Sequence, residues 1–549
     1  MSGWRKALPD FRHFTLLPCW GDPDLFAALR WVPYYTLSHF HQLPFWNPYK
    51  CGGMPMLGNP ESAIVTPFLL FYLPLGLTPG MLVEVYLHLV LAFAGGYVLG
   101  RELGLRPLAC VVLAAMFPSS SWLPLHVGAG QFNFLSAAYL PWILALLLAA
   151  CRTRRWYPAA LGGLVCALTL TEGNYPFVYA ALLVAMLALV LSILHLSIRP
   201  LAAAALIGVF ALAFGALKLI PVSEMLTLHP RFYGASWITW PGVLESLFSH
   251  NQDSYRPSSQ PFTFVEFGGY LSAPFVALAL IGIIGAGRNA VTWIIGTIAF
   301  LLLFRGDTGP HALITYLHLF PLGKNLGFCG RWVMPLVFCV SVLAALGAQL
   351  VCDRLQVWGP RVAAVLLAVG LVDAFLVGSL NYRYLFHHNF EGPLPHSYSF
   401  RQAWTPIGLV MAGTAEANMG YLNCAGIGYN VPSGDVRGYD QAGYRGEAYL
   451  LGAGDVKNTL WTPNRLAYEV NVPAATSLVI NQNFYPGWRL TAGRGSIYAA
   501  GTLIAVHIPP GRYQIEIAYA PPHVLFALAL TLLASVALIV IWWFETRRT

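Results

Sequence analysis

Residues 177–196 read FVYAALLVAMLALVLSILHL, without one Asp, Glu, Lys or Arg. An apolar run of about 20 residues is long enough to cross the hydrocarbon core of a bilayer as a helix. Because nothing in this run interrupts a helix or requires water, it predicts a membrane-spanning segment. The class of fold therefore follows from this stretch and from the runs around it.

Ten further apolar runs have the same character. The whole chain of 549 residues is 57% hydrophobic and 10% charged, whereas soluble proteins have about 25% charged residues. The sequence therefore predicts a polytopic α-helical membrane protein with about eleven transmembrane helices. The ten runs are residues 82–99, 107–123, 134–150, 157–170, 201–222, 271–284, 291–304, 332–351, 362–380 and 524–544.

Basic residues gather in alternate connections between these runs. The connections and the C-terminal tail hold Arg101, Arg106, Arg152, Arg154, Arg155, Arg199, Arg288, Arg354, Arg361, Arg547 and Arg548, against only Glu102, Asp353 and Glu545. Cytoplasmic loops are enriched in Lys and Arg, so we expect these segments and the C-terminus inside the cell. The long polar segments 223–270, 305–331 and 381–523 then lie outside. The net charge of +8 reflects this bias, and we expect no nucleic-acid partner.

The chain divides into four parts. Residues 1–80 form an outer loop region with membrane-surface helices, 81–380 a transmembrane helical domain, 381–522 an outer β-rich domain, and 523–549 the final helix and its cytoplasmic tail. Eleven spans and an inner C-terminus place the first region outside, although no span precedes it. We therefore expect a further helix upstream of Met1.

The third part changes its periodicity. Residues 475–481, 503–508 and 513–519 alternate apolar and polar side chains, and Pro486-Gly487 and Pro510-Gly511 mark turns between them. Alternation with period two, punctuated by turns, is typical of antiparallel strands. We predict a small β-sandwich here.

Four short motifs resemble the YfhO-type bacterial membrane proteins, which are placed with the GT-C glycosyltransferases. They are PFWNPY at 44–49, GGMP at 52–55, NFYPGW at 483–488 and IPPGRY at 508–513. The resemblance spans nearly the whole chain. It implies a GT-C-like fold in the bacterial plasma membrane, and an enzyme that takes a sugar from a polyprenyl-phosphate donor. The acceptor would be a cell-envelope polymer or lipid on the outer face.

The resemblance also implies an acidic residue in the first outer loop, and Asp22 and Asp24 match that position. Glycosyl transfer needs a base near the acceptor hydroxyl, which either carboxylate can supply. Both residues also stand just before a periodic run, where Asp is a favoured helix cap. With the resemblance we prefer the catalytic role, with Asp22 ahead of Asp24.

The donor phosphate needs positive charge. Lys324 and Arg331 lie in a predicted outer loop just before a span, where basic residues are unexpected. We therefore expect them to bind the phosphate of the donor. The alternative is an interfacial contact with the headgroups of membrane lipids.

Glu172, Asn174 and Tyr175 lie between two closely spaced runs, and Glu266 borders a long outer segment. An acid at the depth of Glu172 is costly unless it is paired or functional. We predict that these residues bind substrate. The alternatives are a loop acid that reaches water at Glu172, and a solvated rim position at Glu266.

The sequence has no Gly-rich nucleotide loop, no nucleophile elbow and no Asp-x-Asp pair with further ligands nearby, so we expect neither a cofactor nor a metal. Its nine cysteines do not favour a disulfide between Cys19 and Cys51. The rival functions are a transporter of lipid-linked sugars and a non-catalytic scaffold for envelope assembly. A transporter would show two similar halves with broken helices, which the chain lacks.

Overall fold

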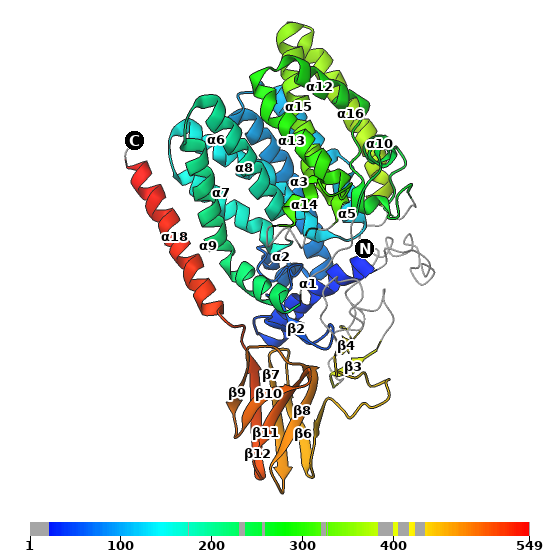
Figure 1. Cartoon of the computed structure of the whole chain (residues 1–549), viewed down its shortest axis with the longest axis vertical. Coiled ribbons are helices and arrows are strands. Elements are labelled where there is room, and N and C mark those ends of the chain that lie inside the picture. The colour runs from blue at the N-terminus through cyan, green and yellow to red at the C-terminus, as the bar shows by residue number, and fades with distance from the viewer. Residues whose placement is uncertain are drawn as a thin grey trace.

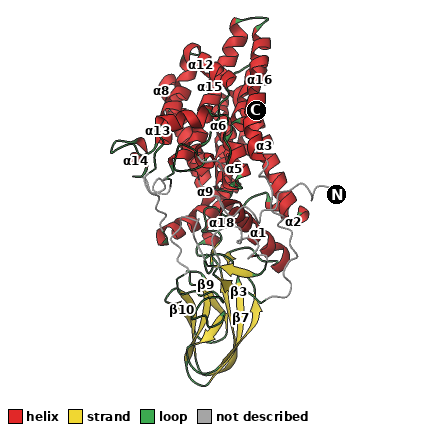
Figure 2. Ribbon diagram, turned by 90° about the vertical axis from the view of Figure 1, so that its right-hand side faces the viewer, coloured by secondary structure: helices red, strands yellow, loops and turns green. Residues whose placement is uncertain are grey.

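The computed structural model of the protein describes residues 21–173, 175–229, 236–254, 258–319, 326, 328–382, 399–404, 415, 417–422 and 434–547. Figure 1 shows a bundle of helices with a smaller domain of β-strands at one end, and α1 and α2 lie where the two meet. Figure 2 shows from a second direction that the long strands are confined to that end. The predicted architecture, a polytopic helical protein with a C-terminal β domain, is confirmed.

Each apolar run predicted from the sequence falls on a helix. Among the described residues, nine helical segments are long and apolar enough to span a membrane, and the segments Tyr157–Thr171 and Ala273–Gly285 are apolar but shorter. In several spans a short helix and a longer one follow each other directly. The helices of the bundle are α3 (Leu77–Glu102), α4 (Pro107–Ser119), α5 (Trp122–Gly128), η3 (Phe132–Tyr139), α6 (Leu140–Thr153), α7 (Tyr157–Leu168), η4 (Thr169–Thr171), α8 (Tyr175–His195), α9 (Arg199–Leu228), α10 (Trp240–Phe248), α11 (Phe264–Phe267), α12 (Ala273–Gly285), α13 (Arg288–Arg305), α14 (Leu313–Leu317), η6 (Cys329–Trp332), α15 (Val333–Arg354), α16 (Gly359–Tyr382) and α18 (Val524–Thr546).

The helix α15 forms the centre of the bundle. Its apolar window is 83% buried, because α4, α12, α13 and α16 all pack against it. The approach of α12 is very close: a Cβ atom added at Gly347 would lie 1.8 Å from the carbonyl oxygen of Leu278. Small residues at such crossings let membrane helices pack tightly, so Gly347 allows the close α12–α15 contact.

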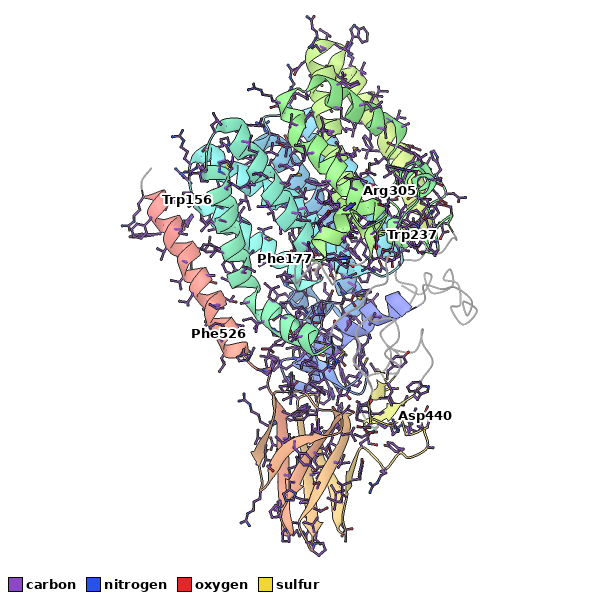
Figure 3. All side chains as sticks on the ribbon, in the orientation of Figure 1. Trp156, Phe177, Trp237, Arg305, Asp440 and Phe526 are labelled. Atoms are coloured by element: carbon purple, nitrogen blue, oxygen red, sulfur yellow. The ribbon has the colours of Figure 1, made fainter. Side chains whose placement is uncertain are left out.

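The final helix α18 lies at the periphery, with only 11% of its apolar window buried. It packs mainly on α9, and Figure 3 places Phe526 near the β domain and Trp156 beside the opposite end of the helix. There Glu545 accepts hydrogen bonds from the backbone N–H groups of Trp156 and Tyr157, at 2.7 and 3.1 Å. These N–H groups have no partner within α7 because they begin that helix, so Glu545 fixes α18 to the bundle.

The segment 21–75 lies between the helical bundle and the β domain. It contains α1 (Gly21–Phe40), the short hairpin of β1 (Trp46–Asn47) and β2 (Met54–Pro55), and α2 (Leu69–Leu75). Lys218 of α9 is buried beneath it and donates to the carbonyl oxygens of Asn59 and Ser62, at 2.6 and 2.8 Å. A buried ammonium must be fully hydrogen-bonded, so Lys218 ties this segment to the bundle.

The C-terminal domain is a β-sandwich. One sheet has the order β10-β11-β8-β5 and the other β6-β7-β12-β9, and the strand pairs that build both sheets are antiparallel. Apolar side chains of both sheets form one core, for example Ile480 and Ile504 of the first and Val470 and Ile515 of the second. The predicted strands 475–481, 503–508 and 513–519 correspond to β8, β11 and β12. The bounds are β5 (Ala448–Leu450), β6 (Asp455–Trp461), β7 (Arg465–Val472), β8 (Thr476–Asn483), β9 (Trp488–Ala492), β10 (Ser496–Ala500), β11 (Leu503–Ile508) and β12 (Gly511–Tyr519).

Trp46 of the N-terminal segment is part of the core of this distant sandwich. Its side chain is completely buried, and its ring lies 5.2 Å from that of Trp488 and 4.8 Å from that of Tyr519. The indole N–H donates to Gln482 Oε1 at 2.8 Å, and the Trp46 backbone N–H donates to Asn464 Oδ1 at 2.9 Å. Trp46 therefore joins the segment 21–75 to the sandwich by both packing and hydrogen bonds.

The turn after Trp46 is held by Asn483 of β8. The Asn483 side chain donates to the carbonyl oxygen of Cys51 at 2.6 Å. The backbone N–H of Asn483 donates to the carbonyl oxygen of Gly52 at 2.7 Å. Gly53 has φ +103°, and a Cβ atom there would lie 2.6 Å from the Trp46 ring, so only glycine fits. Cys51 is disulfide-bonded, and its partner lies outside the described residues.

Replacing Trp46 by Ala should loosen the sandwich from the bundle. Removal of a fully buried Trp costs about 3–5 kcal/mol, because a cavity and unpaired polar groups remain. We expect faster hydrogen exchange in β8 and β12 of the full-length protein, measured by mass spectrometry. Trp358→Ala, at a position that is 65% exposed, is the control and should leave exchange unchanged. Equal exchange in both variants would contradict the docking role of Trp46.

Glu447 links the sandwich to a small parallel sheet of β3 (Arg401–Ala403) and β4 (Met419–Tyr421). Its half-buried carboxylate accepts hydrogen bonds from the Gln402 backbone N–H and the Tyr444 hydroxyl, at 2.7 and 2.9 Å. Burial raises the pKa of Glu447 to about 7, and these hydrogen bonds only partly oppose the rise. Ionisation of Glu447 therefore opposes the folded arrangement near neutral pH.

The sandwich should accordingly be more stable in mild acid. The pKa of Glu447 is higher in the folded state than in the unfolded chain. Its contribution to stability is therefore fully present below about pH 4.5 and is lost as the pH rises through about 7. We expect hydrogen exchange of β5 and of residues 399–404 to accelerate between about pH 6 and 8, beyond the intrinsic pH effect. In Glu447→Gln this additional dependence should disappear; its persistence would assign it to another group.

Candidate functional site

Three residues predicted from the sequence to contact substrate meet in one cluster. Arg331, in η6 at the start of α15, binds the carboxylate of Glu266 in α11 through Nε at 3.1 Å and Nη2 at 3.5 Å. The two side chains are only 12% and 19% exposed. Tyr175, the first residue of α8, lies beside them, with its ring centre 4.9 Å from the Arg331 guanidinium carbon. We call Arg331, Glu266 and Tyr175 the Arg331 cluster.

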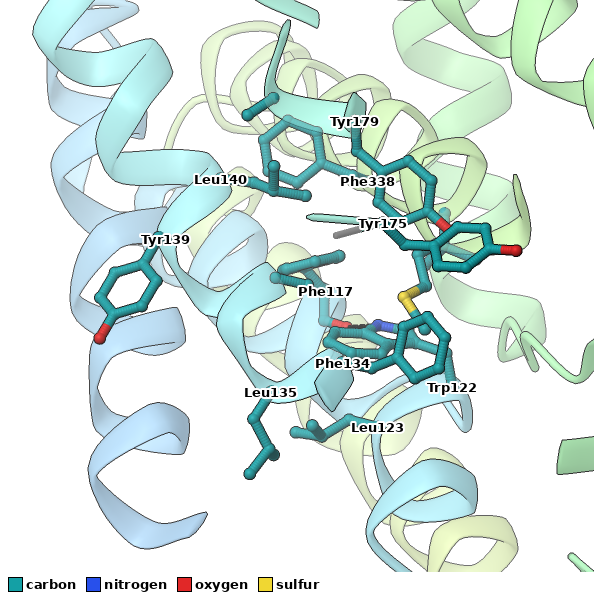
Figure 4. Packing of buried hydrophobic residues seen from close by; sticks show 14 of the residues in the cluster. Phe117, Trp122, Leu123, Phe134, Leu135, Tyr139, Leu140, Tyr175, Tyr179 and Phe338 are labelled. Atoms are coloured by element: carbon teal, nitrogen blue, oxygen red, sulfur yellow. Dashed lines mark hydrogen bonds between the residues drawn. The ribbon is translucent and has the colours of Figure 1, made fainter. Parts of the chain in front are cut away.

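Aromatic rings surround the guanidinium of Arg331. The ring centres of Phe134 and Phe328 lie 5.2 and 5.5 Å from its central carbon, and Figure 4 shows Phe134 and Tyr175 next to each other. The Tyr175 hydroxyl is buried and has no hydrogen-bond partner among the described residues. The Tyr179 hydroxyl donates to the Arg331 carbonyl oxygen at 2.7 Å, which fixes the backbone of η6. The rings therefore exclude most water from around the Arg331 guanidinium, although 12% of the side chain stays exposed.

Two neutral side chains extend the Arg331 cluster, and no sequence pattern pointed to either. Gln131 donates to Glu266 Oε1 at 3.5 Å, and His126 Nδ1 lies 2.6 Å from Gln131 Oε1. Burial alone would raise the pKa of Glu266, but the charge and hydrogen bonds of Arg331 hold it below its ordinary value. Glu266 is therefore an ionised hydrogen-bond acceptor rather than an acid that holds a proton.

A second cluster lies deeper, and it is centred on a buried ion pair. Arg30 of α1 binds Glu84 of α3 in fork geometry, with Nε at 3.1 Å from Oε2 and Nη2 at 2.7 Å from Oε1. The Tyr72 hydroxyl also donates to Glu84 Oε2. Both charged side chains are almost completely buried, with 1% and 0% exposure. We call this pair, with Tyr72, His88 and Glu172, the Arg30 cluster.

Glu172 belongs to the Arg30 cluster and not to the Arg331 cluster. It is 1% exposed, so it does not reach water, and burial raises its pKa well above the ordinary value. Thr66 donates to its Oε1 at 3.3 Å, and His88 Nε2 lies 3.3 Å from its Oε2. The sequence alone indicates that burying an acid at Glu172 is costly. It does not identify the partners Thr66 and His88, because they lie 106 and 84 residues away in the chain.

The helix η3 separates the two clusters and touches both. The guanidinium carbon of Arg30 lies 4.9 Å from the ring centre of Phe132, and that of Arg331 lies 5.2 Å from the ring centre of Phe134. Residues two apart on a 3₁₀-helix point in different directions, so Phe132 and Phe134 on one turn contact different arginines. Any shift of η3 would therefore move the walls of both clusters.

For four of the predicted site residues the structure describes no side chain. Lys324 and Asn174 lie outside the described residues. Asp22 and Asp24 lie in the first turn of α1, but their side chains are not among those described. The first turn also attracts negative charge through the helix dipole, so the capping alternative remains open.

Neither a profile of a known protein family nor a curated protein sequence matches the chain. Two crystal structures of the Archaeoglobus fulgidus oligosaccharyltransferase are similar over 74% of this chain, with 13% and 12% identity and TM-scores of 0.40 and 0.41. One holds zinc and sulfate, and the other is tethered to an acceptor peptide. The aligned part spans 59% and 61% of those chains. The likeness is distant, and the YfhO-type assignment stays a prediction.

Removing Arg30 should strongly destabilise the protein. Arg30→Ala leaves Glu84 buried without its counter-ion, which costs about 3–5 kcal/mol. We expect a clearly lower temperature of unfolding for the purified protein. Arg152→Ala is the matched control, because Arg152 binds Glu102 in the same fork geometry but is 63% exposed. It should change little.

The double variant Arg30→Met, Glu84→Leu separates loss of charge balance from loss of shape. It removes both charges and keeps apolar bulk, so it should recover much of the stability lost in Arg30→Ala. If the double variant were as unstable as the single one, Glu84 would have a stabilising role beyond the ion pair.

Proposed function

We propose that the protein is a glycosyltransferase of the bacterial plasma membrane. It moves a sugar from a polyprenyl-phosphate donor to a cell-envelope polymer or lipid on the outer face. The observation that carries this proposal is the meeting of Arg331, Glu266 and Tyr175 in one partly exposed cluster. A cation, an ionised carboxylate and a hydroxyl among aromatic rings are groups that transfer from a lipid phosphate can use.

Arg331 is the proposed partner of the donor phosphate. When the bond between the sugar and the phosphate breaks, negative charge grows on the phosphate oxygens. A fixed guanidinium stabilises that charge, and it does so more strongly where aromatic rings exclude water. Arg331 would then be shared between the phosphate and Glu266, as arginine forks allow. The buried Tyr175 hydroxyl supplies a further donor beside it.

The acceptor hydroxyl must lose its proton as its oxygen bonds to the sugar carbon. Glu266 is poorly suited to take this proton, because Arg331 lowers its pKa and so makes it a weak base. It suits hydrogen bonds to sugar hydroxyls better. Asp22 therefore remains the proposed base, with Asp24 as the second choice. Lys324 is proposed to assist Arg331, and Asn174 to help bind the acceptor. Glu172 is only 1% exposed and lies in the Arg30 cluster, so its predicted contact with substrate is not carried into this proposal.

The proposed orientation puts the sandwich and the segment 21–75 outside the cell and the C-terminus inside. The disulfide at Cys51 supports this orientation, because disulfides persist in oxidising compartments and are rare in the cytosol. The six cysteines in or beside the helices of the bundle, Cys110, Cys151, Cys166, Cys329, Cys339 and Cys352, are free.

The test is sugar transfer by the purified protein in lipid nanodiscs, with a panel of radiolabelled polyprenyl-phosphate sugars. Arg331→Ala should weaken donor binding by about 10–100-fold, which is the loss of one charge-assisted contact of about 1.5–3 kcal/mol. Asp22→Asn should lower the turnover rate by about 10²–10⁴-fold without weakening donor binding. Arg512→Ala, which breaks an exposed pair with Glu469 in the sandwich, is the control and should behave as wild type.

Two results would contradict the proposal. If the Asp22→Asn and Asp24→Asn variants both keep the wild-type rate, these residues are helix caps and not bases. If the intact protein binds the donors but transfers none of the sugars, a transporter or a scaffold becomes the better description. Flux of the labelled lipid across the bilayer of sealed vesicles then separates these two.

A further inference from the structure

The Arg30 cluster holds a group of potential metal ligands that the proposed function does not use. Glu84 and His88 lie one turn apart on α3, and Glu172 follows η4. One donor atom from each of the three lies within 4.8 Å of the other two. All three side chains are buried, with at most 1% exposure.

The hydrogen bonding of His88 determines which ring nitrogen carries the proton. Its Nδ1 lies 2.8 Å from the backbone carbonyl oxygen of Glu84. A carbonyl oxygen can only accept, so Nδ1 must carry hydrogen and donate to it. In a neutral imidazole, Nε2 then presents a lone pair. A histidine that ligates a metal commonly has this arrangement, with the other nitrogen donating to a carbonyl or carboxylate.

The lone pair of His88 Nε2 faces a second acceptor. Glu172 Oε2 lies 3.3 Å away, and neither atom has a hydrogen-bond partner among the described residues. The other oxygen of Glu172 already accepts from Thr66. Two buried acceptors that face each other repel unless a proton or a metal ion lies between them.

The charge of the cluster requires a cation as well. Arg30 neutralises Glu84 through the fork described above. Arg30 also attracts Glu172, but with His88 neutral it is one cation facing two carboxylates among the described residues of the cluster, which is costly at this depth. Either a proton or a metal ion must supply the missing positive charge.

The distance between the two atoms fits a metal ion held between them. A charge-assisted N–H···O bond between imidazole and carboxylate would be about 2.7–2.9 Å long. Two ligands of one tetrahedral Zn²⁺, each about 2.0–2.2 Å from it, lie about 3.3–3.5 Å apart. The separation of His88 Nε2 and Glu172 Oε2, 3.3 Å, matches the second case. One imidazole and two carboxylates form a donor set that first-row divalent ions accept.

We propose that His88 Nε2, Glu172 and Glu84 bind a structural divalent metal ion of the zinc type. Arg30 and Tyr72 hold Glu84 from behind, and the Glu84 carbonyl orients His88, so the ligands are preorganised. The ion would join α3 to the segment that leads from Glu172 into α8. It would thereby fix the position of Tyr175 beside Arg331. This inference does not depend on the reaction proposed above.

The test measures metal directly, without any sugar transfer. The full-length protein, freed of its affinity tag, is purified in detergent and analysed for metal content. It is then stripped with a chelator and titrated with Zn²⁺ and Co²⁺. We expect about one ion per chain, a rise in unfolding temperature with Zn²⁺, and the visible absorption of tetrahedral Co²⁺.

Glu172→Gln is the decisive variant. Its amide can donate to His88 Nε2, so the fold is preserved while a ligand is lost. Metal affinity should fall by more than the ~10–100-fold that loss of an outer-shell partner costs, and the Co²⁺ absorption should vanish. His195→Gln, at the exposed end of α8, is the matched control and should bind as wild type.

Two outcomes would overturn the proposal. If the wild type binds no metal and Glu172→Gln is as stable or more stable, a proton bridges the two side chains. If Glu172→Gln binds metal as well as the wild type, the ion lies elsewhere. Neither outcome bears on glycosyl transfer, so failure here is distinguishable from failure of the proposed function.

Discussion

The docking of Trp46 into the β-sandwich is the interaction on which the rest of the architecture depends. The segment 21–75 is held at one side by Trp46 and Asn483 and at the other by the buried ammonium of Lys218. In the chain these contacts lie between α1 and α2, which deliver Arg30 and Tyr72 to Glu84. The hairpin is thus one of the links between the sandwich and the helical bundle, beside direct contacts such as that of Tyr485 with His229.

This arrangement gives a physical meaning to motifs that first appear as family signatures. The residues PFWNPY and GGMP contain Trp46 and the glycine beneath the indole ring, and they flank the turn at Cys51. The distant run NFYPGW contains Asn483 and Trp488, which hold that turn and that ring. The motifs are therefore two halves of one interface. Their pairing accounts for these residue types without any chemistry, so the motifs alone do not identify a reaction.

The sequence predicts local structure well and long-range pairing poorly. Hydropathy locates the eleven apolar helical segments of the described part of the chain, because burial in lipid needs a continuous apolar run, and period-two alternation locates β8, β11 and β12. Glu84 and His88 stand four residues apart on α3, but His88 contacts the Glu84 backbone, and the Glu84 carboxylate binds Arg30, which is 54 residues away. Arg331 and Glu266 are each unusual for their position, but 65 residues separate them and no pattern joins them. Gln131 and His126 gave no signal, because neutral polar residues near a span are common.

The two sides of the Trp46 interface are synthesised at very different times. Trp46 and Asn464 are 418 residues apart in the chain. At a synthesis rate of about 5–20 residues per second, the indole ring waits roughly 20–80 s for its pocket. During that time a large apolar surface and the carbonyl groups of the hairpin have no partner, and the helices of the bundle insert around an unfinished junction. The hairpin around Trp46 is therefore a site that chaperones can bind in the nascent chain. Its release from them would depend on synthesis of the β-sandwich.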